Sequence, residues 1–287
     1  MATFTTTNTG PTEMDLILSV VQDELIRAAK LRPTVMDMSS RAEKGIKSIE
    51  IPRYDTHFAN PAAQNADGVT PVAAQTVDFA TDVLSLDKWV TLPYEIPDRI
   101  SKQSRINLEA ELAASAGRTF GKYIDDELIV ALRAASAAAP DHRLQLSGGT
   151  NDEITLDDIT AAREALNKAD VKEEDRFLLV SPKQERAMLN IANFIEADKY
   201  GAREALLNGE IGKVYGFRVM VHNGLSDNEA IAYQKEAVAF AMQKDMNFES
   251  RRASLGLQKT EYAFSAGWGT VTLEQGVKQV LLNDTGA

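Results

Sequence analysis

Residues 117–122 come closest to a phosphate-binding motif in this sequence. Their order, Gly-Arg-Thr-Phe-Gly-Lys, suggests a loop that would hold phosphate through backbone N–H groups and a lysine. The two glycines are one residue too close for that motif, Tyr123 stands where Ser or Thr would bind magnesium, and no strand precedes the segment. The helical spacing around it favours a packing role, in which Gly117 and Gly121 let another element approach closely.

The three histidines, His57, His142 and His222, lie in separate segments of the chain. A zinc site needs clustered ligands, and none of the three has a second histidine four residues on, so we expect surface or loop histidines. A Ser–His–Asp triad can have any chain order, but no Gly-x-Ser-x-Gly turn is present to hold its nucleophile. Cysteine is absent, which excludes disulfides, thiolate zinc sites and Cys nucleophiles.

Acidic residues cluster at 125–127 and at 152–158, without the alternating spacing and central glycine of a calcium loop. We expect Asp126 and Glu127 to face solvent or to pair with a cation such as Arg133. A hydrolase of sugars would use two carboxylates, but nothing in the spacing singles out a pair.

The composition is that of a folded globular protein, since 44% of the 287 residues are hydrophobic and 25% are charged. Lys and Arg number 31 against 42 Asp and Glu, and the net charge of −11 disfavours nucleic-acid binding through a broad basic face. Arg251 and Arg252 are adjacent basic residues in an otherwise acidic chain. We expect them to form salt bridges between subunits. No apolar run reaches the ~18 residues of a membrane span, and the Thr-rich residues 1–11 lack the features of a secretory signal.

The first part of the chain is expected to hold an arm, a helix and a long hairpin. Residues 1–12 bury nothing and suggest a disordered arm, and apolar residues at helical spacing predict a helix at 13–31. Strands at 46–51 and 76–86 predict a hairpin whose tip, 52–75, has almost no large apolar residues. Because a two-stranded hairpin is only marginally stable alone in water, we expect this hairpin to pack against a surface outside its own domain.

A second, longer helix is predicted at about 105–138, where apolar residues recur every three or four positions. We expect Leu112, Ile124 and Leu128 to be its core positions. Such a helix would be about 50 Å long, well beyond the usual three turns.

The second half alternates helices and strands, which predicts an α+β fold with a mainly antiparallel sheet near the C-terminus. Thr155 is expected to cap one helix, and Ser181-Pro182 starts another, with Gln184 as its capping-box partner. Strands are predicted at 176–180, 217–221, 238–242, 269–273 and 277–282.

The order of these elements resembles the major capsid proteins of tailed bacteriophages, whose Hong Kong ninety-seven fold is also used by encapsulin shells. The resemblance covers nearly the whole chain and depends on order and spacing, since no single stretch is specific. Residues 176–182 look like the strand-to-helix entry of the family's axial domain, and 212–219 look like its Gly-centred turn into a strand. The strands that close its peripheral domain resemble residues 237–241, 249–252 and 266–269.

The resemblance implies five parts of the chain. They are an N-terminal arm (1–45), an extended hairpin called the E-loop (46–90), a peripheral or P-domain with a spine helix (91–175), an axial or A-domain (176–240) and closing P-domain strands (241–287). It also implies that the E-loop contacts neighbouring copies, and the large apolar residues available there are Tyr54, Phe58, Val69 and Val72.

The function implied is structural: pentamers and hexamers of this chain form an icosahedral head that encloses double-stranded DNA without sequence-specific binding. No enzyme activity, cofactor, metal or membrane partner is expected. The implied partners are a separate scaffolding protein, a portal and a cement protein, with assembly in the host cytoplasm and a final location in the virion capsid. An encapsulin-type compartment is the alternative within the same fold. A carboxylate-based hydrolase is a further alternative, but no nucleophile, base and oxyanion stabiliser can be assigned.

Covalent cross-linking between subunits can be tested directly. Some members of the family join an E-loop lysine to an asparagine of a neighbour, and residues 54–76 contain no lysine. Assembled particles are therefore expected to dissociate in hot detergent to monomers of 31.4 kDa. A denaturing gel checks this, and a ladder of covalent multimers would contradict it.

Overall fold

The computed structural model describes residues 13–54, 79–99, 108–137, 142–148, 152–191, 212–253 and 258–284. Both helices and strands are abundant, which confirms the α+β class. None of the described helices is long and apolar enough to cross a membrane. The elements are α1 (Glu13–Ala28), η1 (Arg32–Thr34), β1 (Met36–Asp37), η2 (Ser39–Arg41), β2 (Ser48–Tyr54), β3 (Phe79–Ser85), β4 (Lys88–Pro97), α3 (Leu108–Arg133), β5 (Arg143–Gln145), α4 (Leu156–Lys168), β6 (Arg176–Val180), α5 (Pro182–Leu189), β7 (Lys213–Val214), β8 (Phe217–Val221), β9 (Glu229–Gln234), η5 (Lys235–Ala237), β10 (Val238–Arg252), β11 (Lys259–Thr272), η6 (Glu274–Gly276) and β12 (Gln279–Asn283).

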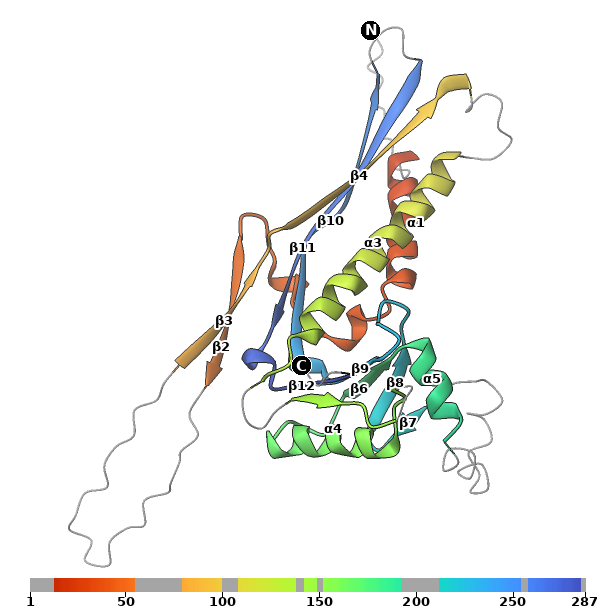
Figure 1. Ribbon diagram of the computed structural model, residues 1–287. Helices are drawn as coiled ribbons and strands as arrows, with labels where there is room; N and C mark the ends of the chain where they lie inside the picture. The colour runs from red at the N-terminus through yellow and green to blue at the C-terminus, as the bar shows by residue number, and fades with distance from the viewer. Residues whose placement is uncertain are drawn as a thin grey trace, which may run out of the picture.

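The strands form three sheets (Figure 1). A four-stranded sheet has the order β1-β10-β11-β4, and a six-stranded sheet has the order β5-β12-β9-β6-β8-β7. The third sheet is the antiparallel hairpin β2–β3, in which Ser48 lies opposite Ser85 and Tyr54 lies opposite Phe79. The six-stranded sheet also holds parallel pairs, since β5 runs parallel to β12 and β8 runs parallel to β6. The C-terminal strands pair antiparallel as expected, β10 with β11 and β12 with β9.

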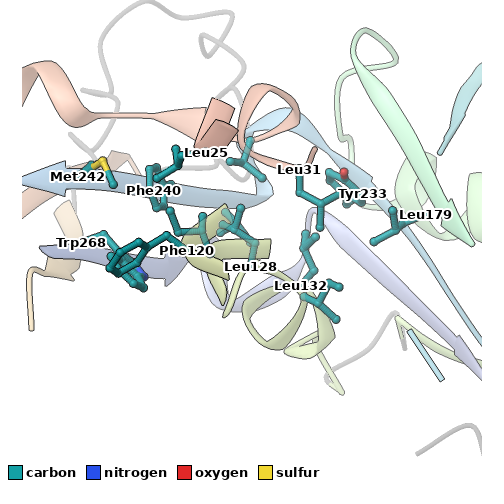
Figure 2. Packing of buried hydrophobic residues seen from close by; sticks show 14 of the residues in the cluster. Leu25, Leu31, Phe120, Leu128, Leu132, Leu179, Tyr233, Phe240, Met242 and Trp268 are labelled. Atoms are coloured by element: carbon teal, nitrogen blue, oxygen red, sulfur yellow. The ribbon is translucent and has the colours of Figure 1, made fainter. Parts of the chain in front are cut away.

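The core lies between α3 and the two larger sheets. α3 has 26 residues and is about 39 Å long, and Figure 1 shows it along the four-stranded sheet with α1 beside it. The rings of Phe120 and Trp268 meet edge to face with their centroids 6.5 Å apart. Figure 2 shows the same cluster reaching the six-stranded sheet through Leu179 and Tyr233. One continuous core therefore joins both sheets.

One of the expected core positions of α3 is wrong. Ile124 and Leu128 are fully buried, but Leu112 is only half-buried. Successive residues of a helix are about 100° apart, so Leu112 lies to the side of the buried stripe, which at this end of the helix consists of Ala113 and Ala116.

The spine helix also ends earlier than predicted, at Arg133 instead of 138. The chain turns there because the N–H of Ser136 donates to the carbonyl oxygen of Gly276 in η6, at 3.2 Å. The neighbouring residues 138–141, and 101–107 at the other end, lie outside the described residues.

β4 is a strand that the sequence does not predict, because Pro93 and Pro97 argue against one. β4 lies at the edge of its sheet and pairs only with β11 among the described strands. Proline has no N–H to donate. It is tolerated in an edge strand because one side of such a strand has no partner strand that needs the hydrogen bond. Since β3 ends at Ser85 and β4 starts at Lys88, the predicted E-loop range 46–90 includes the first residues of β4.

The expected domain ranges can be compared with the sheets that their strands join. β10 and β11 lie in the four-stranded sheet, but β12 joins the six-stranded sheet, so the range 241–287 does not close a single sheet. β10 begins at Val238, inside the range 176–240 assigned to the A-domain. α4, expected in the P-domain, packs on the six-stranded sheet through Ile159 and Leu166. The chain crosses between sheets at η6, and this crossing leaves no signal in the hydrophobic pattern.

The predicted arm, 1–45, is part of the body from residue 13 onward. α1 packs against α3, and β1 pairs in parallel with β10. Leu31, Val35 and Met38 between and after these elements are buried. Residues 1–12 lie outside the described residues.

The two predicted helix caps are present. Thr155 caps α4 in a complete capping box, and the Ser181 side chain accepts the N–H of Gln184 at the start of α5. The Gln184 side chain does not complete the second box. Its amide instead joins two loops by bonding to the backbone of Asp152, Ile154 and Asp227.

The buried face of α3 predicts the effect of a cavity mutation. Leu128→Ala is expected to lower the free energy of unfolding by about 2–5 kcal/mol, because the removed methyl groups leave a cavity in a fully packed core. Leu189→Ala is a matched control, since Leu189 is 46% exposed, and it should cost less than about 1 kcal/mol. Chemical denaturation of the purified subunit measures both, and equal losses would contradict the assignment of the stripe.

Candidate functional site

The predicted E-loop contacts lie at and beyond the outer end of the hairpin β2–β3. Tyr54 is the last residue of β2. Phe58, Val69 and Val72 lie outside the described residues. Figure 1 shows the hairpin at the left, beside the four-stranded sheet and directed away from the rest of the body. The structure therefore fixes where the predicted contact segment leaves the body and where it returns.

The hairpin is attached to the body at its base. Leu84 is fully buried there, in a small cluster separate from the main core. The other buried members of this cluster are Ile49 and Leu86 near the hairpin, and Met38, Ala42, Ala239, Ala241 and Leu273 from the body. A Cβ atom on Gly269 of β11 would lie 2.1 Å from the carbonyl oxygen of Ser85. Only glycine at this position lets the backbone of the hairpin touch β11.

The segment that resembles a phosphate loop is a helix–helix contact. Gly117 and Gly121 lie within α3, where backbone N–H groups are used by the helix itself. A Cβ atom on Gly117 would lie 2.5 Å from the carbonyl oxygen of Val21, and one on Gly121 would lie 2.5 Å from the Cβ of Ala28. The expected close approach of another element is confirmed, and that element is α1.

His142 and His222 both lie in loops, which agrees with the expectation of surface or loop histidines, but His142 is buried and His222 is largely covered. His142 is fully buried, with Nδ1 at 3.0 Å from the carbonyl oxygen of Gln279. The His222 side chain is 12% exposed, with Nε2 at 3.1 Å from Oδ2 of Asp125. His57 lies outside the described residues. Within the described ranges, no group of three or more His, Cys, Asp or Glu residues could hold a metal ion.

Arg251 and Arg252 make ion pairs inside the chain, and the expected salt bridges between subunits stay a prediction. Arg251 lies 3.0 Å from Glu261 on the adjacent strand β11, and Arg252 pairs with Asp98. Both pairs hold the far end of the β4–β10–β11 sheet together.

Arg133 pairs with a different acid from the two expected. Its Nε and Nη2 atoms donate to the two carboxylate oxygens of Glu229, at 2.6 and 2.7 Å. The hydrogen bond to Glu229 raises the pKa of Arg133, so the guanidinium stays charged. Because Glu229 begins β9, this ion pair ties the end of the spine helix to the six-stranded sheet.

A buried polar cluster around Asp125 joins four segments of the chain. Asp125 is fully buried and accepts three hydrogen bonds. The N–H of Lys30 donates to Oδ2 at 2.9 Å, the N–H of Leu31 donates to Oδ1 at 3.1 Å, and Nε2 of His222 lies 3.1 Å from Oδ2. Since the N–H of Gly224 donates to Nδ1 of His222 at 3.0 Å, the proton of the neutral imidazole must sit on Nε2, facing the carboxylate.

The cluster continues to the six-stranded sheet through Thr34 and Tyr233. The Thr34 hydroxyl donates to the carbonyl oxygen of Leu31 at 2.7 Å. That hydroxyl is therefore left to accept from the Tyr233 hydroxyl, also at 2.7 Å. Burial, together with the nearby charge of Asp125, raises the pKa of Tyr233 above its usual range. The hydroxyl stays protonated and acts as a donor.

Asp125 is the important residue that the sequence analysis misses, because it stands in an acidic triplet that suggests a solvent-facing surface. Its spacing carries a usable signal. Asp125 follows Gly121 by four residues and precedes Leu128 by three, so it lies on the same buried face of the helix. A lone carboxylate on such a face predicts a buried, hydrogen-bonded acid.

The fold matches that of viral shell proteins. A structure from Mycobacterium phage Che8 has 19% identity and a TM-score of 0.73, covering 90% of this chain and 92% of that one. The capsid structure of cyanophage P-SCSP1u has 16% identity and a TM-score of 0.70, covering 99% and 92%. A virus-like particle from Pyrococcus furiosus has 11% identity and a TM-score of 0.61, covering 95% and 100%. A search of curated proteins gave no match.

The sequence itself decides the family. The pattern of the phage capsid protein family matches residues 22–281, which is most of the chain. The chain belongs to the phage capsid protein family, and it is a structural shell subunit. The resemblance stated from the order of elements is thereby confirmed.

Asp125 provides a test of how the body is held together. Asp125→Asn should lower the free energy of unfolding by about 2–3 kcal/mol. The carboxylate accepts three hydrogen bonds, whereas the amide of Asn has only one acceptor oxygen and its NH₂ group would face an N–H donor. Asp126→Asn is the matched control, since Asp126 is only half-buried, and it should cost less than about 1 kcal/mol. Urea denaturation compares the two variants, and similar losses would mean that Asp125 has no special role.

Proposed function

We propose that many copies of this chain, arranged as pentamers and hexamers, form the icosahedral head of a tailed phage that encloses double-stranded DNA, with the E-loop of each copy lying over a neighbour. The proposal assigns the chain no catalytic step. The observation that carries it is the hairpin β2–β3, which forms its own two-stranded sheet and contacts the body through a small cluster at its base and a hydrogen bond further out.

An isolated two-stranded sheet is marginally stable in water, so the outer part of the hairpin needs a surface to lie against. A stable contact between proteins typically buries about 800 Å² on each partner. The hairpin with residues 55–78 is long enough to supply much of that area on a neighbouring copy. A shell gives every hairpin such a neighbour.

The net charge of −11 fits a shell that encloses DNA better than a protein that binds DNA tightly. A wall rich in Lys and Arg would bind phosphate strongly and release it only at high salt. In this proposal a separate scaffolding protein guides assembly in the host cytoplasm, a portal occupies one vertex, and a cement protein supplies the stability that cross-links supply elsewhere.

An encapsulin-type compartment that holds a protein cargo is the second candidate. It is favoured only by the shared fold of the virus-like particle from Pyrococcus furiosus. Electron microscopy of the particles and analysis of their contents separate the two candidates, because one predicts DNA inside the shell and the other predicts protein.

Replacement of residues 54–76 by a short Gly-Ser turn tests the role of the E-loop. The variant should stay folded and soluble, because loop length changes the closure entropy slowly and the segment adds little to the core. It should no longer form closed particles. Circular dichroism measures the fold, and sedimentation measures the assembly.

A control variant keeps the length of the segment and changes only Asn60, Gln64 and Asn65 to serine. It should still form shells, because the reach of the loop is unchanged. Closed shells of normal size from the shortened chain would show that the E-loop assignment is wrong. Unfolding of the shortened chain would place the segment in a core.

A further inference from the structure

The hairpin β2–β3 touches the body at two separate points along β3. The first is the contact of Ser85 with Gly269 described above, where the backbones of β3 and β11 meet. The second lies three residues further out, where Oδ2 of Asp82 accepts the N–H of Glu274 at 2.9 Å. At about 3.3 Å per residue the two points are about 10 Å apart. Two fixed points on one strand define its angle to the body.

The second point belongs to an unusual turn. Glu274, Gln275 and Gly276 of η6 have φ angles of 49°, 53° and 79°. L-residues adopt this left-handed region as single residues and rarely in succession. Such a turn persists only where its surroundings fix it, and the hydrogen bond from Asp82 is one of the contacts that do so.

Further contacts tie the same turn to the rest of the body. A Cβ atom on Gly276 would lie 2.0 Å from the carbonyl oxygen of Ala134, just after α3. Lys278 pairs with Glu274 at 2.6 Å and lies 3.5 Å from Glu236 of η5, just before β10. The turn is therefore tied to the end of the spine helix and, through Lys278, to η5 before β10.

An open groove of about 400 Å³ separates the hairpin from the body around this contact. Its lining includes Ile51 and Arg53 of β2 on one side, and Glu236 and Lys278 on the other. Asp82 and Glu274 also line it, so their hydrogen bond spans the groove. The groove leaves the hairpin room to tilt about Gly269 once that bond is broken.

We propose that Asp82 is a positioning residue for assembly: its bond to the Glu274 amide sets the angle of the hairpin, and thereby the place on a neighbouring copy that the E-loop reaches. This inference rests on the proposed function for its consequence in the shell. The six-residue step from Ser85 to Phe79 is about 20 Å long, so a tilt of about 10° moves the end of β3 by about 3–4 Å. Such a shift is enough to misalign contacts between subunits.

The angle can be measured on soluble subunits. The chain has no cysteine, so spin labels at Val83→Cys and Val130→Cys, which are 46% and 59% exposed, report one distance between the hairpin and α3. Asp82→Ala should broaden that distance distribution and speed hydrogen exchange at the Glu274 amide by about tenfold or more. Asp82→Asn keeps an acceptor oxygen and should restore a narrow distribution. Glu50→Ala, an exposed acid of the same hairpin, should leave both readouts unchanged.

An unchanged distance distribution in Asp82→Ala overturns the proposal. Loss of the folded circular-dichroism spectrum in both Asp82→Ala and Asp82→Ser also overturns it, because Asp82 would then serve the stability of the subunit. In assembly, Asp82→Ala should give shells of mixed diameter or open sheets, and Asp82→Asn should give uniform shells. If the parent chain forms no shells, the proposed function fails, while the distance measurement still decides the role of Asp82.

Discussion

A charged carboxylate buried in the middle of the longest helix is the constraint on which the rest of the body depends. An ionised acid in an apolar interior costs many kcal/mol unless donors surround it. Asp125 therefore requires N–H groups from elsewhere in the chain, and Lys30, Leu31 and His222 supply them. The N–H groups of Lys30 and Leu31 are withdrawn from α1, which explains why that helix ends at Ala28 and not at the predicted residue 31.

The position of α1 follows from the same contact. With its C-terminal end held at Asp125, α1 must lie along α3, and the close approach is possible only because Gly117 and Gly121 carry no side chain there. Thr34 and Tyr233 extend the polar contacts to the six-stranded sheet, and Arg133 with Glu229 adds a second link nearby. Apolar packing supplies most of the stabilisation of the core, while these polar links determine which segments meet.

The sequence predicts the elements whose signal is local and misses those whose reason is tertiary. The stripe of α3, the caps at Thr155 and Ser181 and the apolar strand β6 all follow from spacing and residue type. β4 is missed because its prolines are acceptable only at a sheet edge, and edges are decided by the whole fold. The contact between Asp125 and His222 is missed because these two residues lie 97 positions apart in the chain. The order of elements still indicated the family, because order survives where single residues change.

The contrast between body and hairpin explains how one chain can be stable alone and still depend on its neighbours. The body has a continuous core that joins α1, α3 and two sheets, so it can fold without partners. The described part of the hairpin contacts the body through the small cluster around Leu84 and the hydrogen bond from the Glu274 amide to Asp82, and it has no part in the main core. Regions with few buried contacts open at low free energy. In the proposed shell, contact with another copy would add buried surface to this hairpin, so part of the energy of assembly would come from a segment that contributes little to the main core.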